Sequence, residues 1–237
     1  MVAPVTRWGQ LLTVPGPRGP VFDPVLPLPD GRTAVDVGSP RSAGDLLGLV
    51  CEVEVPRAAA EGRWIGTLKL SSDKGAVELR VFLDVQPFAL PDHLSFLPEM
   101  NCYGLPENER DYYRVAHRHR TVLNRVPDFQ NGNLASGCAP VLRDGQLDWS
   151  EWDRRFGPLF DGSAFADLPR AGVPIECFYL PLHENWPTTM AVGYQGGYWA
   201  DQAFTPAYRE AFVRMTKAFA EHLSERGRGR RRGTSGV

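Results

Sequence analysis

The sequence contains few cysteine residues and lacks several motifs that would identify a chemistry directly. Its four cysteines show no CxxC spacing, so they predict neither a zinc site nor a redox pair. No GxSxG segment marks a serine nucleophile, and no glycine-rich segment has the spacing of a phosphate-binding or dinucleotide-binding loop. We therefore expect no metal and no cofactor.

The chain also lacks the charge and the apolar runs of a nucleic-acid or membrane protein. Its net charge is -2, whereas a nucleic-acid binder needs a basic face. No apolar run approaches the roughly 18 residues of a membrane span, and residues 1–8 show no charged leader followed by an apolar stretch. We expect no nucleic-acid partner, no membrane partner and a cytoplasmic location for the chain as written, with export of a longer parent protein as the alternative.

An arginine- and glycine-rich segment ends the chain. Its arginines have no apolar neighbours to pack against, and no aromatic residues lie among them. This composition predicts a disordered, solvated tail over residues 227–237, with a nucleic-acid or membrane patch as the less favoured alternative.

Residues 1–87 contain short apolar segments separated by turns, without helical periodicity. The clearest segment alternates apolar and polar residues from Val77 to Val85, which places the apolar side chains on one face of a strand. Several short strands of this kind predict an N-terminal β-sandwich domain over residues 1–87.

Residues 92–226 show a different pattern, in which strand-like and helix-like segments alternate. Strands are predicted at residues 95–103, 121–126 and 173–182. Helices are predicted at residues 107–120, after a capping box at 148–151, and from 206 to Gly227. Such alternation requires parallel strands with helical crossovers. The sequence therefore predicts an α/β domain, a partial (β/α) TIM-type barrel with about three βα units.

Polar and aromatic residues gather where these strands are predicted to end, the edge at which parallel α/β folds bind ligands. The strand-end residues are Asn101, Tyr103, Asn124, Arg125, His183, Glu184, Asn185 and Trp186. A long loop at 187–203 adds Tyr198 and Trp199. Amides, a guanidinium and indoles suit a sugar, so the set predicts a carbohydrate ligand. The alternative is that the loop aromatics are structural filler.

Glu184 is the one catalytic candidate in this set. Glycoside hydrolysis commonly uses two carboxyl groups about 5–10 Å apart, and no second carboxylate is evident at a matching strand end. A single glutamate in such a place more often binds a ligand or a neighbouring arginine by hydrogen bonds.

His117 and His119 lie two residues apart within the helix predicted at 107–120. Their side chains would point in different directions, so they do not predict a shared metal. Arginines around them predict that this part of the helix is a solvated outer face.

Several segments of the chain resemble a known family. Residues 55–67, VPRAAAEGRWIGT, resemble a strand–turn–strand of the sandwich that precedes certain glycoside-hydrolase-like barrels. Residues 88–92, FALPD, resemble the linker of that group, and residues 100–104 and 183–186 resemble further parts of it. Over about residues 20–226, the chain is similar to bacterial glycoside-hydrolase-like proteins related to the β-N-acetylgalactosaminidase family.

This resemblance implies a β-sandwich followed by a (β/α) barrel that acts on glycans, with a substrate of the N-acetylhexosamine type. It also implies a neighbouring Asp–Glu pair on a later strand, in which the Glu is the acid and the Asp orients the acetamido group. The chain has no adjacent Asp–Glu pair, and it stops after its third predicted βα unit. We therefore expect a truncated glycoside-hydrolase-like protein that lacks its catalytic pair, with a non-catalytic carbohydrate-binding or assembly module as the alternative. The open edge of the third strand predicts self-association.

Overall fold

The structure is a computed structural model that describes residues 2–29, 47–127, 134–182, 186 and 206–231. The chain divides into two compact units, Met1–Leu90 and Pro91–Val237, which we call unit 1 and unit 2.

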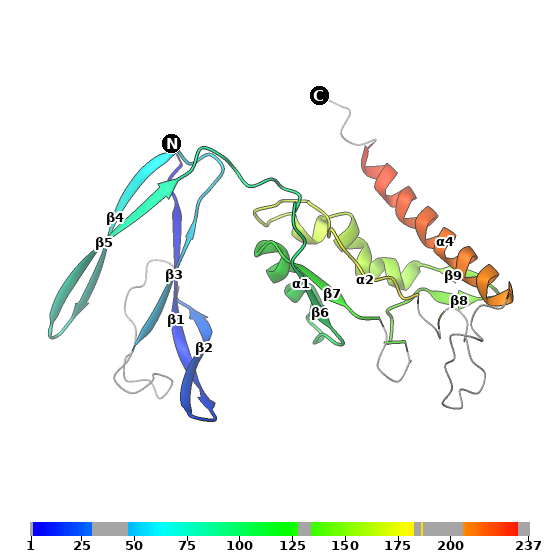
Figure 1. The fold of residues 1–237 in the computed structure, drawn as a ribbon, viewed down its shortest axis with the longest axis horizontal. Helices are drawn as coiled ribbons and strands as arrows, with labels where there is room; N and C mark the ends of the chain where they lie inside the picture. Colours follow the sequence, from blue (N-terminus) through cyan, green and yellow to red (C-terminus); the bar gives the residue numbers. More distant parts are fainter. Residues whose placement is uncertain (1, 30–46, 128–133, 183–185, 187–205, 232–237) are drawn as a thin grey trace. The chain divides into compact units, whose positions relative to one another are not determined.

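Unit 1 is built from antiparallel strands (Figure 1). Its strands are β1 (Val5–Gly16), β2 (Gly19–Pro27), β3 (Gly48–Glu54), β4 (Gly62–Ser72) and β5 (Gly75–Val85). Strand β1 pairs with β2 on one side and with β3 on the other, which gives a three-stranded sheet of order β2-β1-β3. Strands β4 and β5 form a separate two-stranded hairpin within the described residues.

The β4–β5 hairpin follows from a tight turn and from alternation in both strands. Ser72 pairs with Gly75 across the turn, and Gly75 has a φ of +139°, which side chains rarely adopt. Two pairs further from the turn, Leu70 pairs with Val77, and every second pair from there places its side chains on the same face. The strand predicted from the alternation between residues 77 and 85 is confirmed.

The predicted β-sandwich is not present in the described residues. A sandwich requires two sheets whose apolar faces cover each other, whereas unit 1 has a small three-stranded sheet and a hairpin. On the apolar face of the hairpin, Val77 and Val81 are 58% and 45% exposed. The prediction was wrong because alternation shows that one face of a strand is apolar, but not that a second sheet covers it.

Unit 2 combines short strands with helices. Its described elements are β6 (Glu99–Cys102), α1 (Glu109–Arg118), β7 (Val122–Arg125), β8 (Val141–Arg143), β9 (Gln146–Asp148), α2 (Ser150–Phe160), the 3-10 turn η1 (Ser163–Phe165) and α4 (Pro206–Arg231). Strands β6 and β7 pair in parallel, with α1 as the crossover between them. The first two predicted strands and the predicted helices are confirmed, although most of the elements are shorter than expected.

The predicted partial barrel is not present in the part of the chain that the structure describes. Its parallel sheet consists of β6 and β7 alone, and residues 173–182, predicted as the third strand, are not a strand. Pro174 and Pro181 cannot donate to a sheet, and the Ile175 amide donates to the Leu159 carbonyl oxygen at 2.9 Å. The apolar side chains of this segment still pack against the core and are partly buried, so the apolar run predicted contact with the core correctly and the strand wrongly.

Helix α4 continues past the residue at which it was predicted to end. Gly227 lies inside the helix, which runs to Arg231. Residues 227–231 of the predicted disordered tail are therefore helical, and residues 232–237 lie outside the described residues. The prediction failed because glycine lowers helix stability by only about 1 kcal/mol relative to alanine.

An aromatic cluster forms the core of unit 2 and joins α2 to α4. Trp152, Phe156, Phe165 and Phe219 are almost completely buried. The ring of Trp152 meets Phe156 and Phe219 edge to face, with centroids 5.5 and 5.8 Å apart. This core fixes α2, one of the two helices that border the candidate site.

The helix around His117 was predicted to be a solvated outer face, and for His117 itself this prediction is wrong. His117 is buried and stacks on Phe165 with ring centroids 4.0 Å apart, and its Nε2 atom lies 3.0 Å from the Val173 carbonyl oxygen. Burial, together with the charge of Arg170, lowers the pKa of His117 to about 4, so the ring is neutral at neutral pH. His119, in contrast, is exposed.

Candidate functional site

The two predicted site residues at the end of β6 are accessible. Asn101 and Tyr103 are both exposed, and the register places Asn101 beside Asn124 of β7. Asn101 and Tyr103 therefore stay available to a ligand at this edge of the sheet.

The two candidates at the end of β7 are committed to contacts within the protein. Asn124 is completely buried, and its Nδ2 atom donates to the Cys177 sulfur at 3.5 Å. Arg125 donates to the Glu109 carboxylate at 3.1 Å, and both side chains are less than a fifth exposed. The predicted role of Arg125 in binding sugar hydroxyls would require this ion pair to open.

The remaining predicted residues are either packed in the core or outside the described residues. Trp186 packs against the core, with its ring 6.0 Å from that of Phe219 at an angle of 78°. The candidates that lie outside the described residues are His183, Glu184, Asn185, Tyr198 and Trp199.

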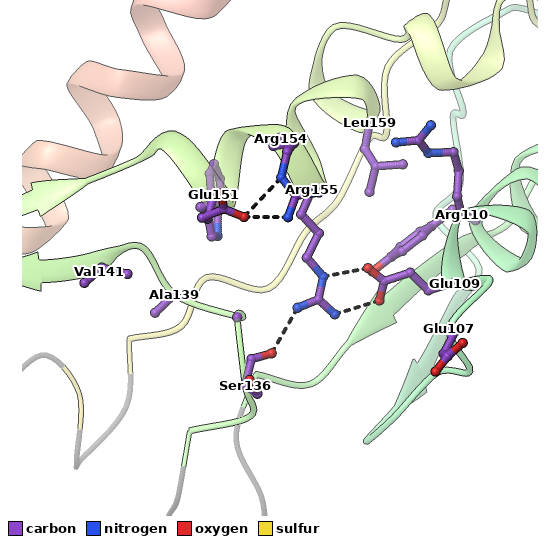
Figure 2. Close-up of a pocket in the computed structure, with 13 residues that line it drawn as sticks. Glu107, Glu109, Arg110, Ser136, Ala139, Val141, Glu151, Arg154, Arg155 and Leu159 are labelled. Carbon is purple, nitrogen blue, oxygen red and sulfur yellow. Dashed lines mark hydrogen bonds and ion pairs between the residues drawn. The ribbon is translucent and has the colours of Figure 1, made fainter.

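A pocket of about 590 Å³ lies between α1 and α2 (Figure 2). Glu107, Glu109, Arg110 and Tyr113 line it on the α1 side. Glu151, Trp152, Arg154, Arg155 and Leu159 line it on the α2 side, and residues 136–141 contribute a third wall. The pocket adjoins the sheet edge because Glu109, on its wall, contacts the last residue of β7, Arg125.

Glu109 organises the floor of this pocket by holding two arginines. Arg155 binds it through two parallel hydrogen bonds, Nε to Oε1 at 2.6 Å and Nη2 to Oε2 at 2.8 Å (Figure 2). Burial alone would raise the pKa of Glu109, but the hydrogen bonds and charges of Arg155 and Arg125 outweigh it and hold the pKa below its usual value. Glu109 is therefore an ionised hydrogen-bond acceptor at neutral pH.

A glycine in the third wall allows Arg155 to take this position. Gly137 has a φ of +65°, and a Cβ atom there would lie 2.8 Å from Nη1 of Arg155. The same Nη1 atom donates to the Ser136 carbonyl oxygen at 3.0 Å (Figure 2). A side chain at position 137 would strain the backbone and require Nη1 of Arg155 to shift.

Two polar atoms of lining residues are buried without a partner among the described residues. They are the hydroxyl oxygen of Tyr113 and Nε1 of Trp152. Burial raises the pKa of Tyr113, so its hydroxyl keeps its proton and can donate. Both atoms are shut off from solvent, and unpaired buried donors of this kind are unfavourable.

The sequence did not reveal this pocket. Glu109 and Arg155 are 46 residues apart, and neither lies in a motif or at the end of a predicted strand. The sequence did contain a local signal for the hairpin that follows the third wall. Asp144 and Gly145 form the β8–β9 turn and both have positive φ, and Asp-Gly is a strong hairpin signal.

Comparison of the chain with protein-family models, with curated proteins and with solved structures found no match. Among the described residues, no helix is both long enough and apolar enough to cross a membrane.

Proposed function

We propose that unit 2 binds a glycan in the pocket between α1 and α2, and that the chain derives from a glycoside hydrolase without acting as one. The pocket carries this proposal, because its walls combine guanidinium donors and carboxylate acceptors, among them the exposed Arg110 and Glu107, in a volume of about 590 Å³. A sugar hydroxyl both donates and accepts hydrogen bonds, so groups of either kind can bind it. The resemblance to proteins related to the β-N-acetylgalactosaminidase family favours an N-acetylhexosamine.

The state of Glu109 supports binding without hydrolysis. A glycosidase needs one carboxylic acid that is protonated when the substrate arrives. Glu109 is largely buried in the pocket wall, yet Arg155 and Arg125 keep it ionised. Its two oxygens accept hydrogen bonds from those arginines, so it supports the shape of the pocket.

Titration of the protein with N-acetylgalactosamine and N-acetylglucosamine by calorimetry tests the proposal. We expect saturable binding, weakened at least about tenfold by Arg110→Ala, because Arg110 lines the pocket and has no ion pair to another described residue. Arg80→Ala, which removes an exposed arginine of β5 in unit 1, should leave the affinity unchanged. Absence of binding to either sugar, or equal losses in the two variants, would contradict the proposal.

Hydrolysis is the competing function, and a separate assay distinguishes it. Aryl N-acetylhexosaminides release a coloured phenol when their glycosidic bond is cleaved. We expect no release above that of the buffer. Turnover that disappears in Glu184→Gln would replace our proposal with catalysis that depends on Glu184.

A further inference from the structure

The end of helix α4 carries the densest positive charge of the sequence. Five of the seven residues from 226 to 232 are arginines, and no aspartate or glutamate follows Glu225. We call residues 226–232 the arginine segment. The helix runs through it as far as Arg231, so four of the five arginines lie on a helical backbone, and Arg232 lies outside the described residues.

The segment differs from the next densest group of arginines, at residues 114–120, which the fold uses internally. There, Arg114 pairs with Asp167 at 2.7 Å, and Arg120 donates to the Pro91 carbonyl oxygen at 2.8 Å. Charges on a helix pair locally with residues three or four positions away, and Glu225 is the one carboxylate in the sequence within that distance of the arginine segment. At least four of its positive charges therefore lack a local counter-charge.

This charge is separated from an acidic remainder of the chain. The net charge of -2 is the sum of five positive charges in the segment and -7 on all other residues, so the whole-chain value hides a basic end. Leu223 is the last residue of α4 that packs against the aromatic core among the described residues. At about 1.5 Å per residue, Arg231 lies about 12 Å further along the helix, which exceeds the Debye length of about 8 Å at physiological salt. Negative charges near that contact are therefore largely screened from the end of the helix.

We propose that the arginine segment binds the phosphate backbone of nucleic acid, independently of base sequence. Helical residues 226–231 place four arginines along about 9 Å of helix axis. Duplex DNA carries one phosphate charge per about 1.7 Å of its axis, so about five phosphates lie along the same length. Guanidinium groups bind phosphate oxygens through paired hydrogen bonds, and contacts of this kind carry no base specificity.

The composition of this end favours nucleic acid over a membrane or a protein partner. Residues 224–232 are serine, glutamate, glycine and arginine alone. A helix that binds in a membrane surface needs an apolar face, and a protein interface is apolar at its centre. The segment offers neither, whereas phosphate binding requires only its charge. The site lies at the end of α4 and does not depend on the glycan pocket.

Fluorescence anisotropy of a labelled DNA duplex of about 20 base pairs, titrated with the full chain, tests the proposal. We expect a dissociation constant in the micromolar range at about 0.1 M salt. The logarithm of the association constant should fall with the logarithm of the salt concentration with a slope of about -4, because each arginine that contacts a phosphate releases a counterion.

A triple variant, Arg228→Gln with Arg230→Gln and Arg231→Gln, removes most of this charge and keeps side chains that favour a helix. Its affinity for the duplex should be at least about tenfold lower than that of wild type at about 0.1 M salt, and its salt slope should be shallower by about 3.

The matched control is a second triple variant, Arg18→Gln with Lys74→Gln and Arg80→Gln, which makes the same change in net charge at exposed sites of unit 1. It should bind the duplex as wild type does. Equal losses in the two triple variants, or no anisotropy change with wild type at about 50 mM salt, would overturn the proposal. Binding to phosphatidylserine vesicles but not to the duplex would also overturn it, and would assign the segment to a lipid surface.

Discussion

Glu109 is the residue on which two arginines from separate elements converge. Arg155 comes from α2 and Arg125 from the end of β7, and all three side chains are less than a quarter exposed. Removing one partner of such a group leaves buried charge without compensation, which costs more than the intact pairs contribute. The residue thus links the fold of unit 2 to the shape of its pocket.

We predict that Glu109→Gln lowers the free energy of unfolding by about 3 kcal/mol, because both guanidinium groups lose their counter-charge. Urea denaturation measures the change. Glu107→Gln, which alters an exposed carboxylate on the same side of the pocket, should change stability by less than about 0.5 kcal/mol. Similar effects in the two variants would show that the contacts of Glu109 add little.

A second prediction concerns the pH dependence that comes from His117. Its pKa is about 4 in the folded chain against a usual value of 6.5, so the unfolded chain binds the proton first as the pH falls. The stability associated with the neutral ring is complete above about pH 6.5 and is lost as the pH falls towards about 4, a loss of about 2–3 kcal/mol.

The free energy of unfolding at about pH 7 and about pH 4.5 measures this loss. His117→Phe keeps an aromatic ring to stack on Phe165 but cannot titrate, so its stability should fall less between the two pH values. His119→Phe, on the exposed side of the same region, should behave as wild type. If His117→Phe shows the full wild-type loss, other groups cause it.

At the scale of single elements, α4 is held to α2 by a short row of contacts. Phe219 is 1% exposed. Beyond it, His222 stacks on Trp149 at 3.9 Å and lies 2.8 Å from the Asp153 carboxylate. Helices of this kind gain most of their stability from such packing.

We predict that Phe219→Ala destabilises unit 2 by about 3–5 kcal/mol, the usual cost of removing a buried aromatic ring. Chemical unfolding followed by tryptophan fluorescence reports it, because Trp149 and Trp152 both contact this ring. Val213→Ala, at a site 51% exposed on the same helix, is the matched control and should have little effect. A loss below about 1 kcal/mol for Phe219→Ala would mean that α4 is not part of the core.

Residues 173–182 provide another test at the element scale. Because they do not form the predicted third strand, most of their amides lack sheet hydrogen bonds. Hydrogen exchange should be faster here than in β7, with Val173 and Ile175 as exceptions because their amides donate to the carbonyl oxygens of Arg170 and Leu159. Uniform slow exchange across the segment would contradict this account.

The elements that the sequence predicted well are those whose pattern depends on local periodicity. The helix at α1, the strand at β7 and the alternation in β5 follow from spacing within a single segment. The segment at 173–182 was misassigned because a buried strand and a buried irregular chain can have the same apolar composition. The pocket was missed because it depends on pairs such as Glu109 with Arg155, which only tertiary packing brings together.

At the scale of the whole molecule, the two units carry separate properties. Unit 1 consists of small antiparallel sheets, and the strands of its β4–β5 hairpin are largely exposed. Unit 2 has a pocket between α1 and α2 that we assign to a glycan. The exposed Asn101 and Tyr103 at the end of β6 remain the predicted site residues that a ligand near this edge could reach.

The most direct test of the central claim follows the indole N–H resonance of Trp152 during titration with N-acetylhexosamines. Trp152 belongs to the pocket wall, and its buried N–H group reports on changes in that wall because it has no partner among the described residues. We predict a saturable shift of the Trp152 signal, while the signals of Trp8 and Trp64 in unit 1 stay in place. If all three signals are unchanged at saturating sugar, the pocket between α1 and α2 is not a glycan site.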